Sequence, residues 1–190
     1  DFVPGQCVNI GIPGSAVNRE YSTYSGLNDD YLEFLIKKVR GGNVSNALSQ
    51  LGLGDEVTLD GAYGLFTLEK PSDPSRSYVF IGSGTGIAPF RSYVRSYPGL
   101  NYKVLHGIRT ADEQYDRVDY DQGRYISCVS AGPGGDFSGR VTDYLVSTQK
   151  QIDPQNHFYL CGNSSMINDV YDILRKFNVS GSHIFTEVFF

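Results

Sequence analysis

The segment over residues 78–89 constrains the fold more than any other part of the sequence. An unbroken apolar run at 78–81 is followed by the glycine-rich turn at 82–88 and then by Pro89. Such a run is typical of a strand that is buried on both faces of a parallel sheet. Proline suits the first turn of a helix, where its missing N–H costs nothing. The segment therefore predicts a strand, a tight turn and a helix in direct succession.

Strand and helix patterns keep alternating after this segment. Apolar runs that predict strands lie at 102–106, 125–129, 157–160 and 184–188. Helical patterns lie at 139–149 and 164–177, and in the second of these the apolar residues recur at steps of three and four. This alternation predicts a doubly wound parallel α/β sheet.

The first part of the sequence has a different rhythm. Short apolar runs that look like strands lie at 7–10, 31–39, 56–59 and 65–68, separated by glycine turns, with one short helical candidate at 46–51. This pattern is typical of an antiparallel barrel or sandwich. The polar segment 69–75 contains two prolines and is a predicted linker. We therefore expect two domains, over residues 1–72 and 73–190.

Composition narrows the possible functions. The net charge is −5, whereas a general nucleic-acid binder needs a basic face. The three cysteines and three histidines are irregularly spaced, so neither a disulfide framework nor a metal site is predicted. No apolar run approaches transmembrane length, and no signal-peptide pattern begins the sequence. We expect a soluble, reduced, cytoplasmic protein, and the start at Asp1 indicates that the native N-terminus is missing or processed.

The glycine turn is a candidate phosphate-binding site. Glycines let backbone N–H groups approach a pyrophosphate closely, and the start of a helix adds a favourable dipole. The turn is not G-x-G-x-x-G, because Ile87 occupies the position of the third glycine, and no Walker loop is present. From the residues alone, a phosphate site and a ligand-free turn are about equally supported.

Three motifs in a shared order resemble those of the ferredoxin–NADP⁺ reductase superfamily. Residues 82–90, Gly-Ser-Gly-Thr-Gly-Ile-Ala-Pro-Phe, are similar to its nicotinamide-nucleotide loop. Residues 19–22, Arg-Glu-Tyr-Ser, resemble its Arg-x-Tyr-Ser flavin motif, and residues 40–45 resemble its second phosphate element. The resemblance implies an antiparallel six-stranded-type flavin-binding barrel, here expected to be short by one strand. A parallel α/β domain that binds NAD(P) is expected to follow it.

The resemblance also implies roles for residues of the flavin half. Arg19 would bind the pyrophosphate of FAD, Tyr21 would lie against the flavin ring, and Ser22 would hydrogen-bond its N5 atom. The other expected FAD ligands are three residues of segment 40–45 and two C-terminal aromatic residues: Gly42, Val44, Ser45, Phe189 and Phe190. Gly61–Phe66 would close the barrel as a structural turn, although Ala62 replaces the usual proline.

In the second half, the resemblance implies a nicotinamide-nucleotide site formed by Gly84, Thr85, Gly86, Arg109, Ser130, Cys161, Gly162 and Met166. The expected catalytic residues are Ser22, Cys161, Glu187 and Phe189. Ala131 stands where members that prefer NADP⁺ often carry an arginine for the 2′-phosphate, which favours NADH over NADPH.

These features together indicate a flavin oxidoreductase that transfers a hydride between NAD(P)H and FAD. A protein acceptor such as ferredoxin, flavodoxin or an oxygenase component would then receive the electrons. The alternative is a non-catalytic nucleotide- or flavin-binding regulatory subunit of a larger complex. A yellow protein whose flavin spectrum bleaches with NADH would be the enzyme, whereas a colourless nucleotide-binding protein would be the regulatory subunit.

Overall fold

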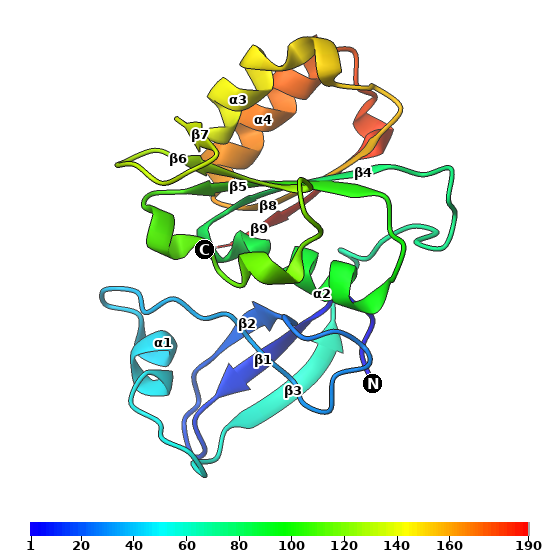
Figure 1. Ribbon diagram of the computed structural model, residues 1–190. Coiled ribbons are helices and arrows are strands. Elements are labelled where there is room, and N and C mark those ends of the chain that lie inside the picture. Colours follow the sequence, from blue (N-terminus) through cyan, green and yellow to red (C-terminus); the bar gives the residue numbers. More distant parts are fainter. Residues whose placement is uncertain (190) are drawn as a thin grey trace.

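Two sheets organise the protein, whose computed structural model describes residues 1–189 (Figure 1). The first sheet is antiparallel and has the strand order β2-β1-β3. Its strands are β1 (Cys7–Gly11), β2 (Asn18–Ser22) and β3 (Thr58–Tyr63), and the short helix α1 (Asn43–Leu48) lies in the connection between β2 and β3. The central strand β1 is the most buried of the three, because it has neighbours on both sides.

The second sheet is parallel and has the strand order β7-β6-β5-β4-β8-β9. Chain order reverses beside β4, which is where ligands bind in doubly wound sheets. The strands are β4 (Tyr78–Ser83), β5 (Tyr102–Ile108), β6 (Tyr125–Val129), β7 (Phe137–Ser138), β8 (His157–Gly162) and β9 (Ile184–Val188).

Helices cover both faces of the parallel sheet (Figure 1). Helix α2 (Ala88–Ser96) lies on the face toward the antiparallel sheet, whereas α3 (Val141–Ser147) and α4 (Ser164–Lys176) cover the opposite face. The side chain of Asn163 caps α4 by accepting hydrogen bonds from two backbone N–H groups of its first turn. None of the helices within residues 1–189 combines the length and the apolar character needed to cross a membrane.

An aromatic cluster joins the two sheets through α2. Phe80 of β4 stacks on Phe90 of α2 with ring centroids 5.0 Å apart, and Phe66 packs edge-on against Tyr159 of β8 at 5.4 Å. The Tyr93 hydroxyl donates a hydrogen bond to the carbonyl oxygen of Phe66. All five side chains are buried, so their packing holds the two parts of the chain together.

The structure confirms the predicted order of an antiparallel part followed by a doubly wound parallel part. The predicted strands and helices of the second part are confirmed, with ends that shift by a few residues. The predicted domain boundary after residue 72 stays a prediction. Segments 31–39 and 65–68 were expected as strands and are irregular, so the antiparallel sheet has three strands among the described residues.

The apolar residues of those two segments pack into the core instead of forming strands. Phe66 and Leu68 are buried in the aromatic cluster, and Leu35 packs against the same core. A run of this kind in a sequence does not distinguish a strand from an irregular segment that crosses a core. Two smaller shifts accompany them: the short helix begins at Asn43 rather than at residue 46, and β3 begins at Thr58 rather than at residue 56.

Candidate functional site

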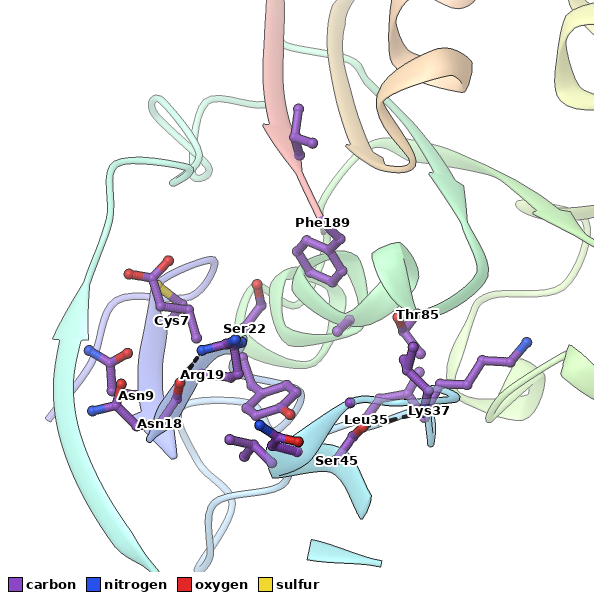
Figure 2. Close-up of a pocket in the computed structure, with 18 of the residues that line it drawn as sticks. Cys7, Asn9, Asn18, Arg19, Ser22, Leu35, Lys37, Ser45, Thr85 and Phe189 are labelled. Carbon is purple, nitrogen blue, oxygen red and sulfur yellow. Dashed lines mark hydrogen bonds between the residues drawn. The ribbon is translucent and has the colours of Figure 1, made fainter. Parts of the chain in front are cut away.

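A cleft of about 790 Å³ lies where the antiparallel sheet meets the end of the parallel sheet (Figure 2). It receives side chains from β1 and β2, from the irregular segment that follows them, from the turn before α1, from the glycine turn and from the C-terminal strand. Among the residues that line it are Arg19, Tyr21, Ser22, Gly42, Val44, Ser45, Thr85, Glu187 and Phe189. The structure thus brings the predicted flavin residues together, except Phe190, which lies outside the described residues.

Strand β2 supplies one side of the cleft. The Arg19 guanidinium donates a hydrogen bond to the Asn18 carbonyl oxygen at 2.9 Å and forms no ion pair within residues 1–189. Ser22 at the end of the strand is buried, with 3% of its surface exposed. In Figure 2, Phe189 projects into the cleft just after the end of β9, opposite Arg19 and Ser22. Tyr21 and Phe189 therefore line one space from the two parts of the chain.

The turn before α1 forms another wall. Gly41 has a positive φ of 78°, a conformation that side chains disfavour, and Gly42 is the N-cap of α1. The Ser45 hydroxyl oxygen accepts a hydrogen bond from the Val39 N–H at 3.2 Å. Ser45 therefore holds the turn closed, while its hydroxyl proton remains available to donate. The ligand roles of Gly42, Val44 and Ser45 stay predictions.

One carboxylate oxygen of Glu187 is contacted by both Ser22 and Cys161. The Ser22 hydroxyl donates to Glu187 Oε2 at 3.2 Å, and the Cys161 thiol approaches the same oxygen at 3.9 Å. Parallel pairing explains this arrangement, because Cys161 of β8 and Glu187 of β9 are partners in the sheet register. Two of the four predicted catalytic residues, Ser22 and Cys161, thus contact a third, Glu187.

Burial sets the protonation of this group. It raises the pKa of the Cys161 thiol, and the neighbouring Glu187 carboxylate raises it further, so the sulfur stays protonated and is a poor nucleophile. Burial also raises the pKa of Glu187, against the opposing effect of its hydrogen bonds with Ser22 and Cys161. Glu187 consequently holds a proton more readily than an exposed glutamate does.

Replacing Glu187 by Gln is expected to raise the free energy of unfolding at neutral pH and to leave it nearly unchanged in acid. The folded protein binds the Glu187 proton more tightly than the unfolded chain, where the pKa is about 4.3. The cost of the buried carboxylate therefore appears as the pH rises from that value through the raised pKa. Urea unfolding of the wild-type and Glu187→Gln apoproteins at about pH 4 and about pH 8 measures the difference in free energy of unfolding. A difference of equal size at both pH values would contradict the prediction.

A second cleft, of about 310 Å³, lies at the carboxyl ends of β4, β5 and β6. Gly84, Arg109, Ser130 and Met166 line it, as expected for part of a nucleotide site. Thr85 instead lines the first cleft, so the glycine turn touches both. Ligand binding at this edge is the general behaviour of doubly wound sheets.

Gly86 and Gly162 line neither cleft and act through close packing. A β-carbon on Gly86 would overlap the carbonyl oxygen of Cys161 and lie 2.6 Å from its carbonyl carbon. Gly162 has a positive φ of 126°, and a β-carbon there would overlap Ser83. The two glycines let the turn approach the end of β8. Their predicted contact with the nucleotide stays a prediction, and the structure gives both a packing role.

Two charged residues that line the clefts could not be predicted as site residues from the sequence. Lys37 lines the first cleft and Glu113 the second, and their Nζ and Oε2 atoms lie 2.7 Å apart. Although burial opposes it, the ammonium group of Lys37 lowers the pKa of Glu113. The ion pair joins the two clefts. These residues lie 76 positions apart in the sequence, so no local pattern relates them.

Comparisons with known proteins agree with this arrangement. Residues 1–68 match the model of the oxidoreductase FAD-binding domain, and residues 80–172 match that of the oxidoreductase NAD-binding domain. The chain is 32% identical over 203 residues to the toluate 1,2-dioxygenase electron transfer component of Pseudomonas putida, covering 99% of this chain and 59% of that protein. It is 29% identical over 209 residues to ferredoxin–NADP reductase B of Sorangium cellulosum, covering 98% of this chain and 84% of that protein.

A solved structure shows the same fold. The crystal structure of a cytochrome P450 reductase from Amycolatopsis superposes with a TM-score of 0.84 at 26% identity, covering 99% of this chain and 61% of that one. This chain thus spans about three fifths of the length of several relatives that it matches, among them the Pseudomonas protein. From both domain matches and the shared fold, the chain belongs to the ferredoxin–NADP⁺ reductase-like superfamily of FAD- and NAD(P)-binding oxidoreductases.

Proposed function

We propose that this protein is an NAD(P)H-dependent flavin oxidoreductase. It would transfer a hydride between a nicotinamide nucleotide and FAD and exchange electrons with a protein acceptor. The observation that carries the proposal is the contact of Ser22 and Cys161 with one oxygen of Glu187, where the large cleft meets the glycine turn. A regulatory module needs nucleotide affinity alone and has no use for a buried group that can hold a proton at this position.

The large cleft fits a flat anionic cofactor. Its volume of about 790 Å³ lies within the usual range of roughly 300–1,000 Å³ for small-molecule sites. Tyr21 and Phe189 offer aromatic surface, and Arg19 offers a cation without an ion-pair partner among residues 1–189. We propose that these residues hold FAD, together with Ser22 and the Gly42–Ser45 turn. Bound FAD would supply the redox chemistry that the side chains lack.

The residues of the chain would contribute orientation, exclusion of water and proton storage. Ser22 and Cys161 are buried and cover part of the Glu187 carboxylate, while the rest of Glu187 lines the large cleft. The Ser22 hydroxyl can donate either to Glu187 or to a ring nitrogen bound beside it. Glu187 takes up a proton at the junction more readily than an exposed glutamate does, because burial raises its pKa. Positioning of this kind can account for most of the rate enhancement in a cofactor enzyme.

The electron acceptor is proposed from the relatives. Their names include the electron transfer component of toluate 1,2-dioxygenase and the reductase component of propane 2-monooxygenase from Mycolicibacterium goodii. We propose a protein acceptor of the same general kind, such as an oxygenase component, ferredoxin or flavodoxin. Residues 1–189 contain no cluster of cysteines for an iron–sulfur centre, so such a centre would belong to another part of the protein or to a partner.

Absorbance spectroscopy tests the proposed function. The purified protein is reconstituted with FAD, freed of excess cofactor and titrated with NADH and with NADPH under anaerobic conditions. We expect a yellow protein whose flavin absorbance falls in proportion to the nucleotide added. A protein that binds either nucleotide while its bound flavin stays oxidised would overturn the proposal and support the regulatory alternative.

We further propose NADH as the preferred nucleotide. Ser130 lines the second cleft, and the next residue, Ala131, donates its backbone N–H to the Arg109 carbonyl oxygen at 2.8 Å at the rim of the same cleft. Position 131 thus offers no cation to a 2′-phosphate. Two arginines, Arg109 and Arg140, line the cleft and could bind any phosphate group of the nucleotide.

Replacing Ala131 by Arg is expected to lower the KM for NADPH about tenfold, because a charge-assisted hydrogen bond to the 2′-phosphate is gained. The KM for NADH should change by less than about twofold, since that nucleotide has no such group. Steady-state kinetics with an artificial acceptor measures both values. Ala131→Gln is the matched control of similar length without charge. An equal effect of both substitutions would show that charge at this position does not set the preference.

A further inference from the structure

His106 is a buried titratable residue that the proposed chemistry does not use. It lies on β5, its side chain has no exposed surface, and it forms two hydrogen bonds. Its Nε2 atom lies 2.8 Å from the Gly84 carbonyl oxygen, and its Nδ1 atom lies 2.7 Å from the Tyr125 hydroxyl. The imidazole therefore connects β6 to the first residue of the helical turn Gly84–Ile87.

These partners determine where the imidazole carries its proton. A carbonyl oxygen can only accept, so the proton lies on Nε2 and is donated to Gly84. The Nδ1 atom then accepts, and the hydroxyl of Tyr125 donates to it. Burial lowers the pKa of His106 to about 4, which keeps the ring neutral at physiological pH and preserves this arrangement. The Gly84 carbonyl oxygen thus fixes the tautomer, and the Tyr125 hydroxyl supports it by donating to Nδ1.

The bond to Gly84 also sets the direction of the next peptide group. The carbonyl oxygen of Gly84 and the N–H of Thr85 belong to one planar trans peptide and point in opposite directions. Because the carbonyl oxygen points to His106 in the core, the Thr85 N–H points away from it. Gly84 lines the second cleft and Thr85 the first, so this peptide lies where the two clefts adjoin. Gly84 has a positive φ of 54°, a conformation that residues with side chains disfavour. This orientation of the peptide therefore depends on glycine at position 84.

We propose that His106 is a positioning residue for the nicotinamide nucleotide, which presents the Thr85 N–H to the nucleotide pyrophosphate by holding the Gly84 carbonyl oxygen. This inference rests on the proposed function for the identity of the ligand. His106 itself touches neither cleft. Tyr125 acts one step further away, by donating to the Nδ1 atom and so holding the ring of His106 in place.

Three variants of the FAD-loaded protein test the role of His106. His106→Leu removes the donor, and His106→Gln keeps a side-chain N–H that can reach the same carbonyl oxygen. Tyr125→Phe removes the hydroxyl that holds the imidazole ring at its Nδ1 atom. We expect the Kd for NADH to rise about tenfold in the Leu variant, to recover to within about threefold in the Gln variant and to rise about threefold in the Phe variant. The Kd for FAD and the rate of flavin reduction at saturating NADH should stay within about twofold in all three.

The outcomes separate positioning from general damage and from failure of the proposed function. An unchanged Kd for NADH in folded His106→Leu would overturn the inference, and so would equal losses of FAD and NADH affinity. Nitrogen NMR of the wild-type protein gives a reading that needs no variant: Nε2 should carry the proton and Nδ1 should not. The opposite tautomer would also overturn the inference. If NADH binds without bleaching the flavin, the proposed function fails, while a weaker Kd in His106→Leu would still support this role.

Discussion

Replacing Gly86 by Ala is expected to destabilise the protein by about 3 kcal/mol and to abolish measurable nucleotide binding. The added methyl group would overlap the Cys161 carbonyl oxygen and lie 2.8 Å from the Gly162 α-carbon. Both are backbone atoms of β8, so no side chain can rotate aside. Either the glycine turn or the end of the strand must move, and each carries part of the candidate site.

The experiment compares urea unfolding and NADH affinity for Gly86→Ala with those of Gly52→Ala. Gly52 is the matched control, because the nearest atom to its added β-carbon would be the Asp55 carboxylate oxygen at 3.9 Å. Neither glycine has the positive φ that would add backbone strain, so the control should change the free energy of unfolding by less than about 1 kcal/mol. A Gly86→Ala variant with normal stability and normal nucleotide affinity would show that the turn and β8 do not need this close contact.

Replacing Arg91 by Met is expected to destabilise the protein by about 3 kcal/mol. The Arg91 side chain on α2 is only 7% exposed, and its guanidinium donates to Glu33 at 2.7 Å and to Asp119 at 2.6 Å. It also lies over the Tyr24 ring, 4.1 Å from the ring centre. Methionine fills similar volume but leaves Glu33 without this cation and leaves Asp119 with the longer contact to Arg95 at 3.5 Å. Because both carboxylates are partly exposed, water limits the loss to less than a fully buried pair would show.

Arg95→Met provides the matched comparison. Arg95 lies one turn later on α2 and pairs with Asp29 at 2.5 Å and with Asp119 at 3.5 Å, but its side chain is 31% exposed. Its loss should cost about 1 kcal/mol, since solvent replaces much of the interaction. Chemical unfolding of both variants measures the difference. Equal costs for the two substitutions would contradict the argument that burial sets the importance of Arg91.

The parallel part of the fold was accessible to sequence reasoning because its signals are local. Strands buried on both faces appear as continuous apolar runs, and the turn after β4 carries glycines and a proline within a few residues. The same locality explains why the predicted Ser22, Cys161 and Glu187 could be identified from short motifs. The sheet register then placed two of them side by side.

The irregular segment after β2 shows what sequence reasoning missed. Residues 31–39 look like a strand, but their backbone does not pair with a sheet. Charged side chains four residues apart, Asp29, Glu33 and Lys37, instead attach the segment to α2 and to the loop after β5. Each of these bonds spans more than fifty residues in sequence. The hydrogen bonds of His106 were missed for the same reason, because partners distant in sequence leave no periodic pattern.

The position of β9 at the edge of the sheet determines how easily the contacts of Glu187 are lost. This strand is outermost in the described sheet, so its backbone has a strand partner on one side only, yet it carries Glu187. Outermost strands open locally at a lower free energy than central ones. Fraying of a few residues would withdraw the carboxylate from Ser22 and Cys161 while the rest of the molecule stayed folded. The proposed activity should therefore be lost at a lower temperature or denaturant concentration than the one that unfolds the whole protein.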